Sequence, residues 1–193
     1  MAKDVITLIT SAHREVERLF DALRSGEGDR ARLASVLCAL LMAHSRAEEE
    51  RVYPVIAKAA PGEKDLVRHS EEEHQEAEEL AQRLTRLDPG GNDFASVLDE
   101  LVSAVALHVE TEESEVLPAL REAVGDDGLS RLGEEFSQRR TEVLQEAPGG
   151  EEALASLTRE ELYERAQAEG VAGRSDMDKE ELAASLREAH RQQ

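Results

Sequence analysis

Aromatic residues are scarce in this chain: it contains no tryptophan, and only 3% of its 193 residues are aromatic, although 40% are hydrophobic. Alanine and leucine must therefore supply most of any core, a composition that suits helices packed on helices. Proline is also rare, with five residues. The good helix formers alanine, leucine, glutamate and arginine are abundant. These shortages predict an all-α protein.

A second group of absences concerns compartment and partners. The single cysteine, Cys38, cannot form an internal disulfide, and within the apolar run VLCALLM we expect a buried thiol. No stretch is long and apolar enough to cross a bilayer, and the N-terminal MAKDVITLITSAH lacks the apolar core of a signal peptide. We therefore expect a cytoplasmic protein without membrane association. The formal charge of −20 opposes binding to nucleic acid, because phosphates repel an acidic surface.

Apolar residues recur at intervals of three and four in four long segments, at about residues 2–25, 29–59, 64–87 and 93–124. The breaks between them are short, which predicts an antiparallel, up-down-up-down four-helix bundle. HREVERLFDAL in the first segment resembles HQEAEELAQRL in the third, so the bundle has the pattern of a duplicated helical hairpin. We expect an extra, fifth helix near residues 128–146 to pack alongside.

The chain is predicted to divide into residues 1–147, the bundle with its extra helix, and residues 157–193, a small helix–extended–helix unit. A Pro-Gly-Gly sequence opens the intervening residues 148–156, which we expect to be a linker. In the small unit, Thr158 with Glu161 and Asp178 with Glu181 match the capping pattern that starts helices. Its run ELYERAQAEGVAGRSDMDKEEL resembles the N-terminal helical module of the transcription terminator Rho and SAP-like modules.

A His-x-x-x-Glu motif occurs twice, 64 residues apart, as His44 with Glu48 and His108 with Glu112. Residues four apart lie on one face of a helix, so each pair can converge on one point. His13 and His74 interrupt the apolar stripes of the first and third segments in the same way. A lone motif of this kind is most often a surface pair, but six ionisable groups on four apolar stripes would be costly to bury without a cation. The pattern predicts a two-metal site.

Imidazole and carboxylate ligands together suit iron, and they also accept zinc or manganese. A ferritin-like di-iron bundle is the main alternative geometry, but it needs two Glu-x-x-His motifs. Only Glu71 with His74 fits that spacing, because Val105 stands three residues before His108. The ferritin-like alternative is therefore excluded.

Residues 1–125 resemble the hemerythrin-like HHE cation-binding family, whose pattern is His…His-x-x-x-Glu…His…His-x-x-x-Glu. The resemblance implies a four-helix bundle that holds a non-haem di-iron centre with an oxo or hydroxo bridge. It also implies that Glu48 and Glu112 bridge the two iron ions. The terminal ligands implied in the same way are four histidines, namely His13, His44, His74 and His108.

The chain departs from the oxygen-carrying hemerythrins on its third helix, where those proteins have a His-x-x-x-His pair. Neither position four residues from His74 holds histidine, which puts reversible oxygen carriage in doubt. His69 lies about 140° around an ideal helix from His74, so we expect a surface residue unless the helix is distorted. Tyr53 lies nominally opposite His44, which favours a packing role over a bend back toward the metals. We expect Glu49, Glu50, Glu113 and Glu115 to form a solvated acidic face.

Three functions fit these features. The favoured one is redox chemistry on a small oxygen species, most specifically catalase-like peroxide dismutation, with O2 as the other ligand. The alternative is a sensor or binding protein for iron, O2 or nitric oxide that signals to a protein partner through residues 157–193. Residues 148–193 carry six Lys/Arg against eleven Asp/Glu, which argues against DNA binding by this unit. A purely structural bundle, with zinc or no metal, is the third.

Overall fold

The computed structural model describes residues 4–26, 28–156, 159–168 and 171–191, and these contain helices and connections but no strand. Two π-helical turns, η1 and η3, and two 3-10 turns, η2 and η4, interrupt or join the α-helices. The elements in order are α1 (Val5–Ser25), α2 (Arg30–Ala47), η1 (Glu48–Val52), α3 (Tyr53–Ala59), η2 (Pro61–Glu63), α4 (Lys64–Leu84), α5 (Asn92–Thr111), η3 (Glu112–Val116), α6 (Leu117–Glu146), α7 (Gly150–Ser156), α8 (Arg159–Ala168), η4 (Arg174–Asp176) and α9 (Lys179–Arg191).

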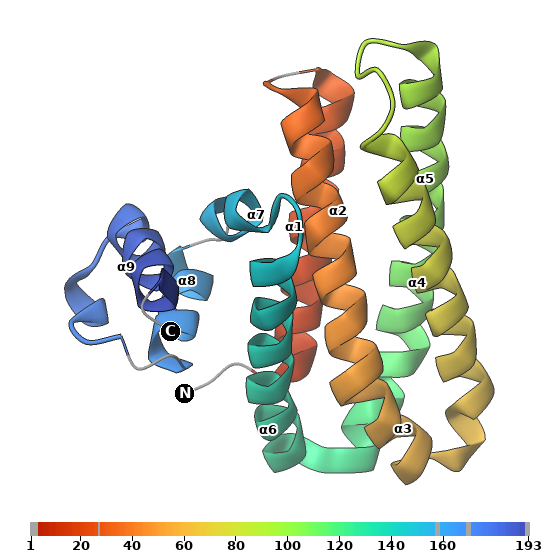
Figure 1. The fold of residues 1–193 in the computed structure, drawn as a ribbon. Helices are drawn as coiled ribbons and strands as arrows, with labels where there is room; N and C mark the ends of the chain where they lie inside the picture. The colour runs from red at the N-terminus through yellow and green to blue at the C-terminus, as the bar shows by residue number, and fades with distance from the viewer. Residues whose placement is uncertain (1–3, 27, 157–158, 169–170, 192–193) are drawn as a thin grey trace.

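Residues 4–26 and 28–120 form the predicted antiparallel bundle, in which α1 runs up, α2 with α3 down, α4 up and α5 down (Figure 1). The helix starts and stops follow local chemistry. Asp4 and Asp29 cap α1 and α2 through their side-chain oxygens, and Gly26 ends α1 in the left-handed conformation, with φ of 72°. The all-α prediction is confirmed.

Both motif-bearing helices widen into a π turn at the motif glutamate. The amide of Tyr53 donates to the Glu48 carbonyl, and the amide of Leu117 donates to that of Glu112, each five residues back. A proline follows one residue later in both cases, at Pro54 and Pro118. Proline has no amide hydrogen and its ring clashes with the carbonyl four residues earlier, so a wider turn lets the helix continue through it.

Two apolar clusters fill the bundle, one toward each end. One cluster lies toward the end of the bundle with the α1–α2 loop and includes Phe20, Leu37 and Leu101. The other lies toward the opposite end and includes Ile9 and Val52. The residues between them are the histidines and motif glutamates. The two clusters therefore enclose a polar layer halfway along the bundle.

The chain reverses at Gly125, whose φ of 64° and ψ of 178° break α6 into the end of the fourth long helix and a fifth helix. This fifth stretch packs against α1 and α2, as predicted (Figure 1). The prediction of a linker over residues 148–156 needs correction, because residues 150–156 form α7. The sequence EEALAS favours this helix, because its acidic residues lie in the first turn. The apolar residues that follow pack on the bundle, and Ala153 is buried against α2.

The small C-terminal unit has its own cluster, formed by Leu162, Ala166, Leu182 and Leu186 of α8 and α9. The predicted cap at Asp178 is present: its amide donates to Glu181, and the Glu181 amide donates to Asp178, both at 2.9 Å. The companion cap at Thr158 lies outside the described residues. The connection between the two helices contains the turn η4 rather than a fully extended strand.

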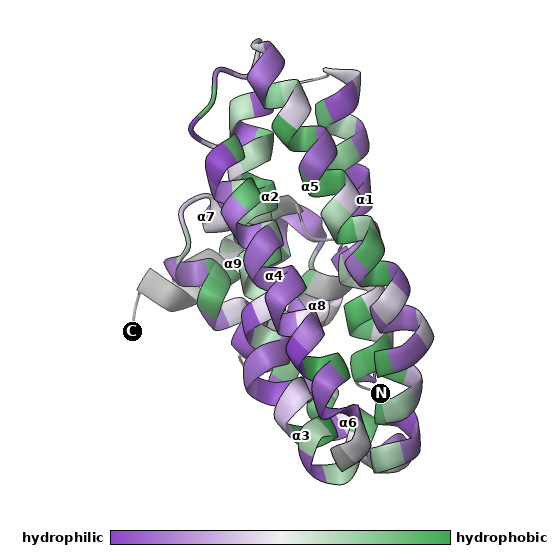
Figure 2. Cartoon of the chain, turned by 90° about the vertical axis from the view of Figure 1, so that its right-hand side faces the viewer, coloured by the Kyte–Doolittle hydropathy of each residue, from purple (hydrophilic) through white to green (hydrophobic). Residues whose placement is uncertain are grey.

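Apolar (green) and polar (purple) stretches are interspersed along the helices (Figure 2). Within the part of the chain that the structure describes, no helix has the length and apolar character needed to cross a membrane.

Candidate metal centre

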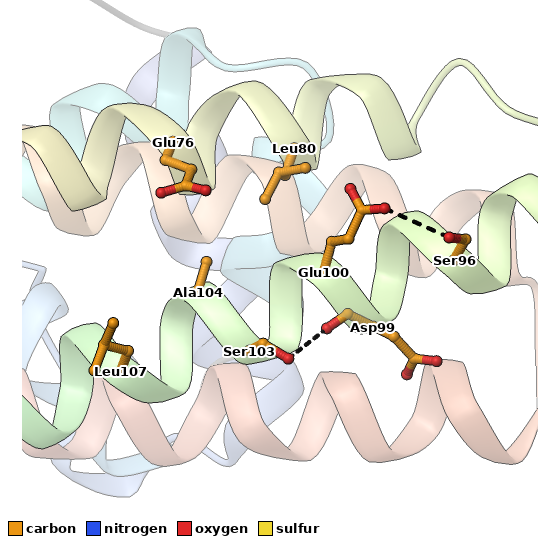
Figure 3. A pocket seen from close by; sticks show the side chains of 8 residues that line it. All are labelled: Glu76, Leu80, Ser96, Asp99, Glu100, Ser103, Ala104 and Leu107. Atoms are coloured by element: carbon orange, nitrogen blue, oxygen red, sulfur yellow. Dashed lines mark hydrogen bonds between the residues drawn. The ribbon is translucent and has the colours of Figure 1, made fainter.

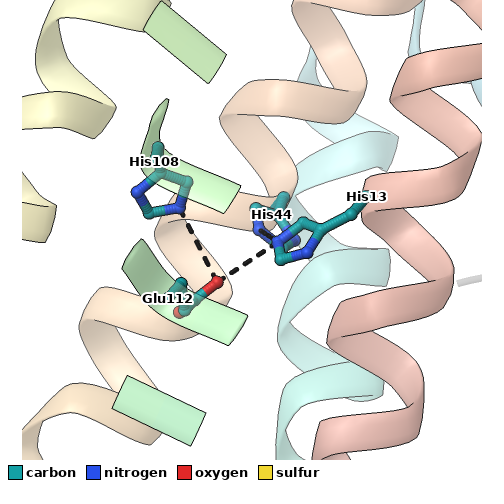
Figure 4. A group of neighbouring side chains, drawn as sticks. All are labelled: His13, His44, His108 and Glu112. Atoms are coloured by element: carbon teal, nitrogen blue, oxygen red, sulfur yellow. Dashed lines mark hydrogen bonds and ion pairs between the residues drawn. The ribbon is translucent and has the colours of Figure 1, made fainter. Parts of the chain in front are cut away.

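The polar layer at mid-bundle brings together the six residues that the duplicated motif singled out. His13 comes from α1, His44 from α2, His74 from α4 and His108 from α5, while the two glutamates open the π turns. Two overlapping groups of four have ligand atoms within 4.8 Å of one another, and all the residues involved are buried. These groups are His13, His44, His108 and Glu112 (Figure 4), and His44, Glu48, His74 and His108.

The four histidines form two pairs. The Nε2 atoms of His13 and His44 are 3.2 Å apart, and those of His74 and His108 are 3.1 Å apart. We call these the His13/His44 pair and the His74/His108 pair. Two nitrogens bound at right angles to one ion at about 2.1 Å lie about 3.0 Å from each other. Each pair therefore has the spacing of two neighbouring ligands on a single ion.

Each motif glutamate lies between the two pairs. Glu112 Oε2 is 3.2 Å from His13 Nε2 and 3.7 Å from His108 Nε2 (Figure 4). Glu48 Oε2 is 3.2 Å from His44 Nε2 and 3.3 Å from His74 Nε2. Each carboxylate thus contacts one histidine of each pair, which is where a ligand shared by two ions would lie.

The donor set fits metal ions because it leaves buried polar atoms without other partners. Glu48 and Glu112 have no exposed surface. Both carboxylate oxygens of Glu48 and Oε2 of Glu112 make no hydrogen bond among the described residues. Buried carboxylates in this condition are costly unless a cation or a proton compensates them.

With no cation present, protons must balance the charge of this layer. Burial and the charge of Glu112 raise the pKa of Glu48 to about 8. Burial alone would raise the pKa of Glu112, but the close ring of His13 and the other nearby histidines lower it to about 2. Burial also opposes charge on His74, but the close carboxylates of Glu48 and Glu49 raise its pKa to about 10. Protons therefore compete with any metal ion for this site.

Three further glutamates hold the outer nitrogens of the histidines. Nδ1 of His13 lies 2.9 Å from Glu113, and Nδ1 of His74 lies 3.3 Å from Glu49. Nδ1 of His108 lies 3.1 Å from Glu73. Such carboxylates fix the ring orientation and leave Nε2 free as the inward-facing ligand.

The expectation of a solvated acidic face holds for Glu50 and Glu115, which are exposed, whereas Glu49 and Glu113 are half-buried and contact histidines. Both follow a motif glutamate directly, so the same 64-residue repeat that revealed the motif could have revealed them. Glu73 could not be found in this way, because it has no counterpart in the first half of the chain.

The expectation that Tyr53 faces away from His44 also needs correction. Tyr53 is buried, its ring stacks on His74 with centroids 5.7 Å apart, and its hydroxyl donates to Glu112 Oε1 at 3.1 Å. The π turn η1 adds about one residue to the intervening turn, which rotates Tyr53 by about 100° toward the centre. Its pKa is raised well above the usual value by burial and by the two motif glutamates. Tyr53 is thus a neutral hydrogen-bond donor to Glu112.

His69, the other candidate on the third helix, lies outside the cluster. α4 is regular through this region, so five residues carry His69 away from the face of His74. Its side chain is 59% exposed and lies 3.3 Å from Glu73. The surface placement expected for His69 is therefore what the structure has.

A small enclosed cavity adjoins the four histidines on the side away from the motif glutamates. Its volume is about 20 Å³, and its other lining residues are mostly apolar: Ala12, Val16, Leu41, Ser45, Ala77, Val105 and Val109. It is large enough for one water-sized molecule. A second hollow, the shallow groove outside α4 and α5, contains no histidine and carries acidic residues beside exposed Leu107 (Figure 3).

The fifth-helix part of α6 closes the His13/His44 side of the centre. The ring of Phe136 packs edge-on against His44, with centroids 6.0 Å apart. One turn later, Arg140 donates to Glu15 at 2.6 Å, and both side chains are largely buried. α6 therefore shields this side of the centre with an aromatic ring and a paired cation.

The fold and the buried histidine–glutamate layer define a helical bundle built to bind cations. Residues 4–120 match the hemerythrin HHE cation-binding domain, and the chain belongs to this family. The family is confirmed; the likeness of residues 157–193 to Rho and SAP-like modules stays a prediction.

Two curated proteins are similar to part of this chain. A DNA nickase of Nostoc sp. strain PCC 7120 is 28% identical over 109 residues, which are 56% of this chain and 30% of that protein. An uncharacterized hemerythrin-like protein of Schizosaccharomyces pombe is 26% identical over 101 residues, 52% of this chain and 50% of that protein. The chain therefore spans half or less of each relative. No solved structure matched the chain.

Proposed function

We propose that this protein is a non-haem di-iron protein that binds or reacts with a small oxygen species. The observation that carries the proposal is the double pairing in the polar layer. Two histidine pairs have single-ion spacing, and each buried glutamate contacts both pairs. One ion would lie at the His13/His44 pair and one at the His74/His108 pair, with Glu48 and Glu112 shared. Mixed nitrogen and carboxylate ligands favour iron.

The protein side chains would orient and shield the metals. Glu49, Glu73 and Glu113 hold the imidazole rings in place, while Tyr53 hydrogen-bonds Glu112. When bound, a pair of irons supplies redox equivalents and a Lewis-acidic position for an oxygen ligand. The apolar core around the layer limits water access.

The cavity beside the histidines supports a ligand of very small size. At about 20 Å³ it has room for about one water-sized molecule, so it would suit a ligand of that scale and exclude an organic substrate. Its mostly apolar lining favours O2 or nitric oxide over peroxide, which needs hydrogen-bond partners. O2 binding is accordingly our first choice, and catalase-like peroxide dismutation is the second, supported by the paired arrangement that two-electron chemistry requires.

Filling the cavity tests this assignment. We expect Ala77→Val, which adds methyl groups to the cavity wall, to retain the metal but to weaken the spectral change that O2 or nitric oxide causes in the iron-loaded protein. Ala81→Val is the matched control, because Ala81 is buried one turn further along α4 and does not line the cavity. Equal ligand responses in the two variants would contradict the cavity assignment. A peroxide-consumption assay on the same samples distinguishes binding from dismutation.

A sensor function is the alternative, and α6 is the observation that favours it. This helix contacts His44 through Phe136 and also packs against α8 of the C-terminal unit. A change at the centre therefore has a direct mechanical route to residues 157–193, where a protein partner would bind. Hydrogen exchange of α6 to α9 with and without the small ligand tests this route; unchanged protection would rule it out.

DNA cleavage, which the name of the Nostoc relative states, is not supported for this chain. The net charge of −20 opposes contact with phosphates, and the aligned region is less than a third of that protein.

A further inference from the structure

The four histidines of the centre differ in whether a carboxylate lies against the outer ring nitrogen, Nδ1. Three of them place Nδ1 against a carboxylate: His13 against Glu113, His74 against Glu49 and His108 against Glu73. Nδ1 of His44 is buried and has no hydrogen-bond partner among the described residues.

The internal repeat explains this difference. His44 corresponds to His108, 64 residues later, and His13 corresponds to His74, 61 residues later. Glu73 directly precedes His74, and the residue that directly precedes His13 is Ala12. Ala12 is buried and lines the same small cavity as His44. Alanine thus stands where the second half of the chain has the supporting carboxylate.

No other side chain that the structure describes near His44 supplies the missing acceptor. The side of His44 that lies toward α6 meets the edge of Phe136, and the nearby cation Arg140 is paired with Glu15. Glu73, by contrast, accepts from His108 through Oε2, while its other oxygen lies 3.3 Å from the exposed His69. The His74/His108 pair has two carboxylate-supported rings, and the His13/His44 pair has one.

We propose that Glu73 is a positioning residue that makes the two metal positions unequal, so that the His74/His108 position binds its ion more tightly than the His13/His44 position. A carboxylate on the outer nitrogen raises the basicity of the ligand and fixes its ring, and losing such a partner costs about 10–100-fold in metal affinity. The chain therefore passes through a one-metal form as metal is added or removed. The inference rests on the proposed two-metal function.

Calorimetric titration of the full-length, metal-stripped protein with Co²⁺ tests this inference, with the visible absorption of Co²⁺ as a second readout of each site. We expect two binding steps whose affinities differ by about 10–100-fold. Glu73→Ala should weaken the tight step by this factor, so that the two steps merge. Glu73→Gln keeps an acceptor without the charge, and it should give an intermediate separation.

Glu78→Ala is the matched control. Glu78 is also a partly buried glutamate of α4, but it pairs with Arg46 and not with a histidine of the centre. Its removal should leave both steps unchanged. Two equal steps in the parent protein, or equal weakening of both steps by Glu73→Ala, would overturn the inference while leaving the two-metal function intact. A parent protein that binds no Co²⁺ would overturn the two-metal function itself, and this inference with it.

Discussion

Glu48 is a fully buried carboxylate whose charge is compensated by the neighbouring histidines or by a bound cation, so its replacement has opposite effects with and without metal. Burial and Glu112 raise the pKa of Glu48 to about 8, from an ordinary value of 4.5. A carboxyl group whose pKa is raised on folding stabilises the fold least at high pH. The free energy by which ionisation of Glu48 destabilises the fold is absent below pH 4.5, grows as the pH rises, and is constant above pH 8.

At pH 7 this destabilisation is about 3 kcal/mol. Each unit by which the pH exceeds the ordinary pKa of the carboxyl group contributes about 1.4 kcal/mol. Glutamine has the shape of the protonated acid and cannot ionise. We therefore expect Glu48→Gln to stabilise the metal-stripped protein by this amount at pH 7, or by roughly 6–12 °C in Tm. At pH 5 the gain should fall below about 1 kcal/mol.

Urea denaturation of the metal-stripped protein at pH 5 and pH 7 measures both values. Glu15→Gln is the control, because Glu15 is also buried but pairs with Arg140. That substitution should destabilise the protein by about 1–3 kcal/mol at either pH. The reasoning fails if Glu48→Gln is destabilising at pH 7, or if its effect is the same at the two pH values. With metal added, the parent should gain about 2.7 kcal/mol at 100 times the Kd, and the variant much less.

Three further predictions concern the neighbours of the centre. Tyr53→Phe removes the hydrogen bond to Glu112 and should cost about 0.5–1.5 kcal/mol in urea denaturation without changing metal content; a fall in metal content would make Tyr53 a ligand instead. Phe136→Ala should cost about 3–5 kcal/mol in the same assay, because a fully buried ring is removed, and a cost below 1 kcal/mol would mean that α6 is not packed on the bundle. Metal affinity should rise from pH 6 to pH 8, since Glu48 and His74, with pKa values of about 8 and about 10, must release protons; calorimetry that shows no such rise would contradict this.

The sequence located the buried histidine–glutamate layer because its signal is repeated. A single His44–Glu48 pair has many explanations, but the second copy at His108–Glu112 and the histidines in register on the other two helices leave few. Burial on four apolar stripes then requires that these residues meet. The helical bundle followed from the same period of three and four residues.

The features of the centre that the sequence does not reveal depend on geometry that an ideal helix lacks. The π turns at Glu48 and Glu112 change the rotation along the helix, so Tyr53 points into the centre instead of away from it. Two prolines at matching positions were the available signal, but proline alone does not say whether a helix ends, kinks or widens. Glu73 could not be found because its contact with His108 runs from α4 to α5. No residue spacing within one helix indicates a contact between two helices.

The most direct test of the whole account is the metal content of protein purified without a metal-affinity column. The account predicts about two iron ions per chain, one for each histidine pair, and a loss of metal in His44→Ala and His108→Ala. Protein that holds zinc alone, or that holds no metal and takes up none when iron is supplied, would contradict the di-iron function.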